Sequence, residues 1–367
     1  MRKRVWLSIP LVLVIAALTA FLVSGYVTSQ APIVIVAEAR DAFQQTTVRA
    51  IADGLTEHGY TVEVRSVPST ADKVAMVNDP ESDVTLALTG SSMREVSYPN
   101  VVSLGTVAAV PFIPLVRTEL GNKVTSLRNF RGLTVALDPP GSDRSELELA
   151  VLQMYGVSLA DFRAVYLDQA EAAKAVVTGD VDAMFLASLN PPEILLGGIE
   201  GGSVQQVLTP EAQALAARLE SEYQGTLPRG GIDVERDIPA EPQPIIISAL
   251  RVLANSSMQD GAAYTIAQVL NDTFAPATMF TQPGDLPWLD GVVPSHPAAT
   301  DYYANGEKPW QFSLLPNMLA DKFALLLLIG SIVLLIANLW GVFLPDALDI
   351  WRDFVHPRLH KEDTPSQ

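Results

Sequence analysis

Residues 131–156 read RGLTVALDPPGSDRSELELAVLQMYG, and this stretch predicts the fold. It begins as a short apolar strand at residues 133–137, passes through a tight turn at residues 139–141 and continues as a helix. The N-terminus of a helix has unpaired backbone N–H groups and the positive end of the helix dipole, so this turn is suited to hold an acceptor or an anion. In open α/β sheets ligands bind at the carboxyl ends of strands, where such turns lie.

The residues before this stretch predict an alternating α/β unit. We expect a buried strand at 33–38 (IVIVAE), a helix at 39–58, a strand at 61–67, a short helix at 71–77 capped by Ser69 or Thr70, and a strand at 83–89. The same order returns after residue 131, with strands at 133–137, 162–168 and 181–188 and helices between them. The two halves therefore repeat an architecture without visible sequence identity.

The later residues predict further elements of the second half. We expect a strand at 203–208, a helix at 210–223, a loop at 225–239, and a helix at 258–274 capped by Ser256 or Ser257.

Two long apolar runs, residues 101–117 and 244–253, are predicted to connect the halves. Pro111 and Pro114 interrupt the first run, which favours an extended crossing and argues against a central strand. Two α/β halves joined by two crossings predict two lobes with a ligand cleft between them, the hinged plan of binding proteins.

Two other segments predict membrane insertion. Residues 323–344, FALLLLIGSIVLLIANLWGVFL, carry no charge and are long enough to span a bilayer. Residues 5–23 are nearly all apolar and follow three basic residues. Their length favours an uncleaved anchor, and the alternative is a signal peptide with a small-residue site near residues 29–31.

Charge placement predicts the orientation in the membrane. Basic residues precede the first apolar segment and follow the second, at Arg2, Lys3, Arg4, Arg352, Arg358 and Lys361. By the positive-inside rule we expect both termini to be cytoplasmic and the main domain to lie outside the cytoplasm. The expected division is anchor and linker 1–30, lobe 1 31–118, lobe 2 119–243, return crossing and helix of lobe 1 244–275, membrane-proximal segment 276–322, transmembrane helix 323–344 and cytoplasmic tail 345–367.

Composition excludes several functions. The net charge is −17, and 36 of the 41 acidic residues lie at positions 31–322, which argues against nucleic acid or an anionic membrane surface as a partner. The chain has no cysteine, so thiol catalysis, disulfides and Cys-ligated metals are excluded. Its four histidines show no metal or triad spacing, and there is no nucleotide-binding fingerprint. We therefore expect no enzyme activity, no cofactor and no metal.

Aromatic residues and prolines gather in residues 275–319. The aromatic residues are Trp288, Tyr302, Tyr303, Trp310 and Phe312. Such side chains favour a membrane interface, and they also pack against protein surfaces, so both interpretations stay open here.

Several short motifs, in order, resemble one transport family. They are Gly132-Leu133-Thr134-Val135-Ala136 with Pro140-Gly141-Ser142, then Gly179-Asp180-Val181-Asp182-Ala183-Met184-Phe185, then Leu227-Pro228-Arg229-Gly230 with Asp233 and Asp237-Ile238-Pro239, then Phe280, Pro283-Gly284-Asp285-Leu286-Pro287 and residues 298–306. With the apolar segment after them, the chain resembles, over residues 124–344, the membrane-anchored solute-binding subunits of TAXI-class TRAP transporters, which are relatives of type II periplasmic binding proteins. The resemblance implies a two-lobed type II domain that captures a small, often carboxylate-bearing solute and delivers it to membrane permease subunits.

Both ligand-facing turns depart from the family pattern. Residues 38–43, EARDAF, stand where the family has a Gly-rich turn, and Asp143 and Arg144 stand where it has Gly and Thr. These departures favour an alternative function, in which a degenerate binding-protein fold acts as a membrane scaffold or sensor subunit without solute transport.

The candidate ligand-binding residues follow from the turns at the strand ends. They are Glu38, Arg40, Thr89, Gly90, Ser91, Gly141, Ser142, Asp143, Arg144 and Arg229. In one interpretation Ser142 and the helix N–H groups hold a polar ligand while Arg144 clamps its carboxylate. In the other, Asp143 and Glu146 form a capping-box-like helix start, and their charges oppose an anionic ligand.

Overall fold

A computed structural model describes residues 32–90, 98–219, 221–309 and 330. By its internal contacts the chain divides into residues 1–308 and residues 309–367, and the description below concerns the first of these units.

The strands of this unit are β1 (Ile33–Glu38), β2 (Val62–Val67), β3 (Leu86–Thr89), β4 (Val101–Arg117), β5 (Thr134–Leu137), β6 (Arg163–Tyr166), β7 (Ala183–Ala187), β8 (Val204–Gln206), β9 (Glu222–Leu227) and β10 (Gln243–Asn255). The helices are α2 (Ala42–Glu57), α3 (Thr70–Asn78), α4 (Asp143–Met154), α5 (Gln169–Thr178), α6 (Glu193–Glu200), α7 (Ala212–Ala216), α8 (Asp260–Phe274) and α9 (Pro297–Asn305), with 3-10 turns η1 (Thr118–Leu120) and η2 (Leu127–Phe130).

The predicted repeat of architecture is present in the strand order. The hydrogen-bonded path runs β2-β1-β3-β10-β4-β7-β5-β6, with β8 on β4 and β9 on β10. Lobe 1 contains β1, α2, β2, α3 and β3, and lobe 2 contains β5, α4, β6, α5 and β7. In both lobes the first strand lies between the second and the third and is parallel to each.

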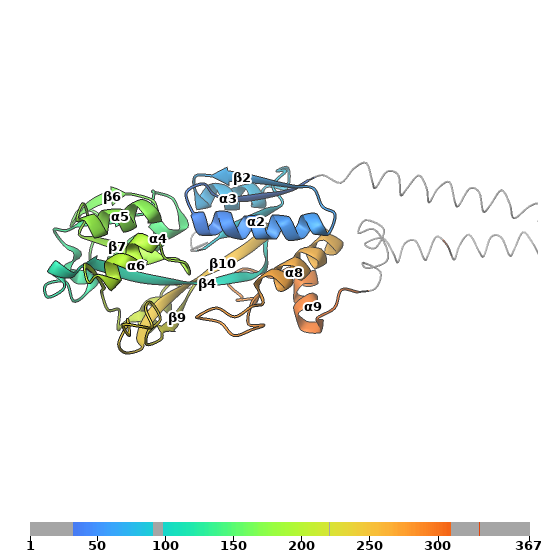
Figure 1. The fold of residues 1–367 in the computed structure, drawn as a ribbon. Coiled ribbons are helices and arrows are strands. Elements are labelled where there is room, and N and C mark those ends of the chain that lie inside the picture. The colour runs from blue at the N-terminus through green and yellow to red at the C-terminus, as the bar shows by residue number, and fades with distance from the viewer. Residues whose placement is uncertain (1–31, 91–97, 220, 310–329, 331–367) are drawn as a thin grey trace, which may run out of the picture. The chain divides into compact units, whose positions relative to one another are not determined.

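The strands β4 and β10 run antiparallel to each other and pass from one lobe to the other, as Figure 1 shows. The expectation that prolines keep residues 101–117 out of the middle of a sheet is wrong, because β4 pairs with β10 and β7. Pro111 is in register with Ile247 alone, and pairing with β7 starts at Phe112. Pro114 is in register with Phe185 of β7, beyond the last β10 pair and before the first β8 pair. Each proline thus lies where β4 has one partner, so the missing N–H removes no ladder bond on the other side.

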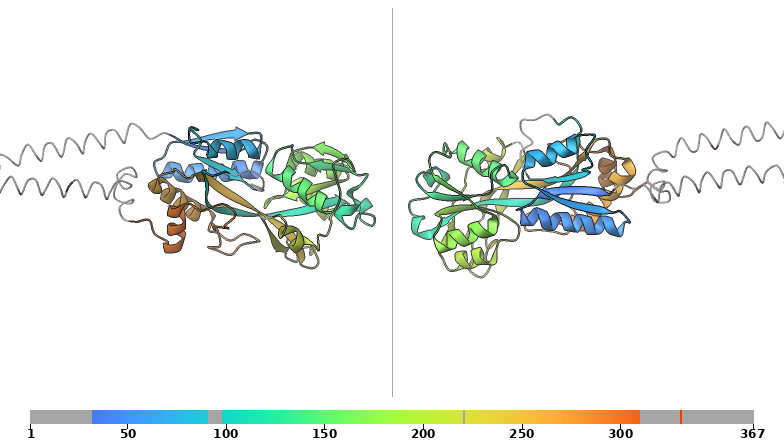
Figure 2. Two further views of the ribbon diagram at one scale, coloured as in Figure 1. Left: turned by 180° about the vertical axis from the view of Figure 1, so that it is seen from behind. Right: turned by 90° about the horizontal axis from the view of Figure 1, so that it is seen from above.

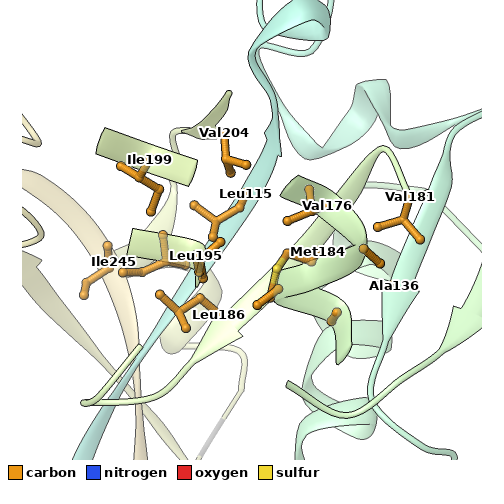
Figure 3. Packing of buried hydrophobic residues seen from close by; sticks show 14 of the residues in the cluster. Leu115, Ala136, Val176, Val181, Met184, Leu186, Leu195, Ile199, Val204 and Ile245 are labelled. Carbon is orange, nitrogen blue, oxygen red and sulfur yellow. The ribbon is translucent and has the colours of Figure 1, made fainter. Parts of the chain in front are cut away.

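Each lobe has its own hydrophobic cluster. In lobe 2, Leu115, Met184 and Leu186 from β4 and β7 pack against Val176 of α5 and Leu195 of α6 (Figure 3). In lobe 1 a second cluster joins side chains of β1, β3, α3 and β10, among them Val34, Val36, Val74, Ala87 and Leu253. Figure 2 shows from two further sides how helices cover the strands in each lobe.

Three sequence predictions about local structure need correction. The helix expected at residues 210–223 is confined to α7, because residues 222–227 form β9 along β10. The loop expected at 225–239 therefore starts later, after Leu227. The helix α8 has Gln259 at its N-cap, beyond both predicted serines, Ser256 and Ser257.

The segment after α8 packs on the protein. Trp288 exchanges two backbone hydrogen bonds with Thr106 of β4, and its ring lies edge-on to Tyr223 at 5.9 Å. Tyr302 is buried on α9, and the Tyr303 hydroxyl donates to the Leu104 carbonyl at 2.8 Å. For these three aromatic residues packing is therefore observed, while Trp310 and Phe312 lie outside the described residues.

No helix in the described part of the chain is long and apolar enough to cross a membrane. The two segments predicted to insert, residues 5–23 and 323–344, lie outside the described residues except for Gly330.

Candidate functional site between the lobes

Helix α4 starts where the opening stretch turns from strand to helix. Ser142 is its N-cap, and the Ser142 hydroxyl accepts the backbone N–H of Ser145 at 3.1 Å. Gly141 precedes it with φ +83°, a conformation that favours glycine. The cap is therefore Ser142, and Asp143 does not take the capping role expected for it. As the first helical residue, Asp143 is free to direct its side chain away from the helix end.

The Asp143 carboxylate reaches into lobe 1, although α4 belongs to lobe 2. It is 3% exposed, and five lobe-1 donors in the described residues surround it. They are the hydroxyls of Thr70 (2.5 Å) and Thr89 (2.9 Å) on Oδ1, and the backbone N–H of Gly90 (2.7 Å), the side-chain amide of Gln44 (3.0 Å) and the ammonium of Lys73 (3.1 Å) on Oδ2. We call these five donors the carboxylate receptacle. A carboxylate accepts about four hydrogen bonds well, so the receptacle saturates it.

The receptacle combines groups from the end of one strand and the first turns of two helices. Thr89 and Gly90 close β3, Gln44 lies in the first turn of α2, and Thr70 and Lys73 lie in the first turn of α3. These positions meet because parallel strands end at the same edge of a sheet and the helices that follow begin there. The receptacle thus lies at the carboxyl edge of the lobe 1 sheet, which is where open α/β sheets bind ligands.

The N-terminus of α4 is also occupied by the chain itself. Glu38, the last residue of β1, accepts the backbone N–H of Asp143 on Oε1 at 3.0 Å. The same oxygen accepts from the Lys73 ammonium at 3.0 Å. The backbone N–H of Thr70 donates to the Gly141 carbonyl at 3.0 Å, which adds a main-chain link between the lobes. The anion expected at this helix end is therefore supplied by a lobe 1 side chain.

Burial and pairing set the charges of this cluster. Burial, followed by repulsion from Asp143, raises the pKa of Glu38 to about 7. Burial also acts to raise the pKa of Asp143, but Lys73 and the hydrogen bonds from Thr70, Gly90 and Thr89 outweigh it and hold this pKa below its usual value. Burial alone lowers the pKa of Lys73, and the Asp143 and Glu38 carboxylates reverse the direction. Lys73 and Asp143 therefore form a buried ion pair, beside which Glu38 changes charge near neutral pH.

Arg144 makes a second bridge between the lobes. Its Nη2 lies 2.8 Å from Oδ1 of Asp41, which also caps α2 of lobe 1, and its Nη1 contacts the side-chain carbonyl of Gln169 at 3.4 Å. Next to it lie Asp138 and Glu148, both buried in lobe 2. Burial raises the pKa of both carboxyls. Repulsion from Asp41 adds to this rise at Asp138, and repulsion from Asp138 adds to it at Glu148. Arg144 thus pairs with a carboxylate of its own chain, whereas one interpretation of the sequence assigned it to the carboxylate of a ligand.

The other predicted site residues are divided between the cluster and the surface. Glu38, Thr89, Gly90, Gly141 and Ser142 lie in or beside the cluster. Arg40 is exposed, and Arg229 pairs with Asp237 on an exposed loop. Ser91 lies outside the described residues.

Sequence reasoning missed Gln44, Thr70 and Lys73. All three occupy buried positions on helix faces that are mainly apolar, Gln44 with Val48 and Ile51 on α2, and Thr70 and Lys73 with Val74 and Val77 on α3. A lysine on the apolar stripe of an amphipathic helix is the signal that could have identified the cluster, because a buried lysine needs an anionic partner. The described residues contain no group of three or more acidic or histidine side chains placed to hold a metal ion.

The strand order, the two crossings and a polar cluster between the lobes define a type II periplasmic-binding-protein-like fold. Residues 54–205 match the family model described as NMT1/THI5 like. Similar solved structures include the periplasmic aliphatic sulphonate binding protein SsuA from Escherichia coli, at 15% identity over 67% of this chain and 74% of that one, with a TM-score of 0.42. Another is MatC from Rhodopseudomonas palustris with bound malate, at 14% identity over 66% of this chain and 84% of that one (TM-score 0.42). A histidine kinase sensor domain with similarity to periplasmic binding proteins matches at 14% identity over 65% of this chain and 88% of that one (TM-score 0.39).

Proposed function

We propose that this chain is a solute-binding subunit whose two lobes close over the carboxylate of a small solute. The observation that carries the proposal is the carboxylate receptacle, in which two hydroxyls, a backbone N–H, an amide and an ammonium converge on one carboxylate position between the lobes. Such a set of buried, mutually oriented donors is selective for planar carboxylates. The names of two similar proteins, a sulphonate binding protein and a malate-bound protein, agree with an anionic solute.

The finer proposal is that the subunit serves a TRAP transporter of the TAXI type. It is supported by the sequence motifs around residues 132–142, 179–185 and 227–239, and by the apolar segments at 5–23 and 323–344. In this proposal the two apolar segments anchor the domain in a bacterial inner membrane, on the side away from the cytoplasm. They keep it at high effective concentration near its permease subunits.

A second candidate function is favoured by the occupant of the receptacle. Because Asp143 fills the carboxylate position, a solute has to displace a side chain of the protein before it binds. A module closed by its own side chain suits a membrane scaffold or a sensor subunit that responds to another signal.

Thermal-shift measurements on the full chain in detergent distinguish the two functions. The ligands are a panel of mono- and dicarboxylates, amino acids, sulfonates and sugars. If the chain is a receptor, one carboxylate class raises Tm, Thr70→Val abolishes the rise, and the surface variant Arg229→Ala keeps it. If no solute raises Tm and a membrane protein is retained on affinity purification, the receptor proposal is wrong and the scaffold function is favoured.

A further inference from the structure

We propose that the Asp143 side chain is a built-in ligand, and that the carboxylate receptacle of lobe 1 is a complete binding site for a free carboxylate once that side chain is removed. The inference goes beyond the proposed function, because it holds whether or not the wild-type chain takes a solute. The ligand class it names is a small monocarboxylate of the size of acetate.

The donors of the receptacle and its acceptor come from different lobes. Every donor of the receptacle belongs to lobe 1, and the acceptor they surround belongs to lobe 2. In a hinged binding protein the ligand makes contacts of this kind to both lobes and so stabilises the closed form. Asp143 makes the same contacts through a covalent attachment to α4.

The side chain of Asp143 has the same chemical groups as acetate. The part of aspartate beyond Cα is a carboxymethyl group, and replacement of Asp143 by glycine removes a fragment that acetate reproduces. Asp143 as a whole residue is 3% exposed, so removal of this fragment leaves a closed space with the receptacle on its wall. The Lys73 ammonium, 0% exposed at its side chain, would then face that space with Glu38 as its remaining carboxylate partner. Loss of the carboxylate from beside a buried ammonium and several oriented donors favours uptake of an anion.

The local structure does not require an aspartate at position 143. Ser142 caps α4, so the helix end keeps its capping hydrogen bond in an Asp143→Gly variant. The Asp143 backbone N–H, which Glu38 accepts, is also retained by glycine. The variant therefore loses the carboxylate and keeps the groups that frame it.

The same geometry predicts how the wild-type protein treats free carboxylates. A tethered ligand competes at an effective concentration that a free monocarboxylate at millimolar levels does not match. Acetate is therefore expected to bind the Asp143→Gly variant and to leave the wild type unchanged. Removal of the built-in ligand is also expected to increase the affinity of any natural carboxylate solute.

The test is carboxylate rescue of Asp143→Gly, measured on the full chain in detergent. We expect the variant to unfold roughly 10 °C below the wild type, since several hydrogen bonds and one ion pair are lost together. Sodium acetate at about 50 mM is expected to raise Tm by roughly 3–6 °C in a saturable manner, whereas sodium chloride at equal ionic strength is not. Titration of carbon-13-labelled acetate, followed by NMR, then reports binding directly.

Three variants serve as controls. Asp143→Asn keeps the space filled and is expected to show no response to acetate. Asp143→Gly/Lys73→Met removes the ammonium and is expected to lose the rescue. Asp168→Gly removes the same fragment from the N-cap of α5, the corresponding start of a lobe 2 helix, where Asp168 accepts the N–H of Glu171 within its own helix. It is expected to lower Tm without a specific acetate effect.

The outcomes separate cleanly. Saturable rescue confined to Asp143→Gly supports the built-in ligand. An equal response in the Asp168→Gly or the Lys73→Met background, or no response in a folded Asp143→Gly protein, overturns it. If Asp143→Gly does not fold, Asp143→Ala with formate is used, and failure of both variants to refold in the carboxylate salt also counts against the inference. None of these results decides whether the wild type binds a solute, which the ligand panel tests separately.

Discussion

The Lys73 ammonium is predicted to be the group on which the contact between the lobes depends most. It lies 3.0 Å from Glu38 of its own lobe and 3.1 Å from Asp143 of the other lobe, and its side chain is 0% exposed. Lys73→Met keeps most of the length of the stem and removes the charge. Two buried carboxylates then remain close to each other without their cation.

The magnitude follows from the distances. At an effective dielectric constant near 20, two opposite unit charges 3.1 Å apart attract each other by about 5 kcal/mol. The cost of removing both charges from water reduces this gain. Removing one partner of a buried pair usually destabilises a protein by about 3–5 kcal/mol. We expect a loss in this range, which corresponds to roughly 10 °C in Tm for a domain of this size.

The assay is urea unfolding of the full chain, combined with a double-mutant cycle. The cycle compares wild type, Lys73→Met, Asp143→Asn and the double variant, and we expect a coupling energy of about 2–3 kcal/mol. Lys174→Met is the matched control, because Lys174 lies exposed on α5, the helix of lobe 2 that corresponds to α3. A Lys73→Met protein within about 0.5 kcal/mol of wild type, or additive single effects, would refute the buried bridge between the lobes.

Two further predictions concern the same boundary. Because the pKa of Glu38 is about 7 in the folded protein and 4.5 in the unfolded chain, the folded form holds an extra proton between these values, and stability falls by about 3 kcal/mol as the pH rises through this window. Glu38→Gln still accepts the Asp143 N–H and should flatten the decline of Tm between pH 5 and 8. It should not abolish the decline, since burial also raises the pKa of Glu222 to about 7. A decline equal to that of the wild type would show that Glu38 does not titrate in this range. Arg144→Met should lower the free energy of unfolding by about 3 kcal/mol, because Asp41 loses its partner across the lobes, and Arg144→Lys should recover only part of the loss. Urea unfolding checks this second prediction, and full recovery by lysine would contradict the role of the guanidinium geometry.

Much of the fold could be predicted from the sequence. The apolar run at residues 33–38 coincides with β1, the helix expected between the strands at 162–168 and 181–188 with α5, and the run at 101–117 with β4, since hydrophobic period and strand length are local properties. The central position of β4 could not be predicted, because Pro111 and Pro114 are tolerated only where the neighbouring strands end, and that register depends on the whole sheet. The strand β9 was missed for a similar reason, because residues 222–227 become a strand through pairing with β10.

The candidate site also combines features that the sequence predicts with features that it does not. The sequence by itself determined that residues 139–141 turn from a strand into a helix, that polar groups gather at the strand ends, and that a charged residue, Asp143, stands at this helix start. These features depend on residues close together in the chain. Only the tertiary structure decided what that charge does. Asp143 meets Gln44 and Lys73 across 99 and 70 residues, because the two crossing strands bring the first turn of α4 to the carboxyl edge of the lobe 1 sheet. Whether such a carboxylate repels a ligand or replaces one depends on the donors it meets, and those donors come from the other lobe.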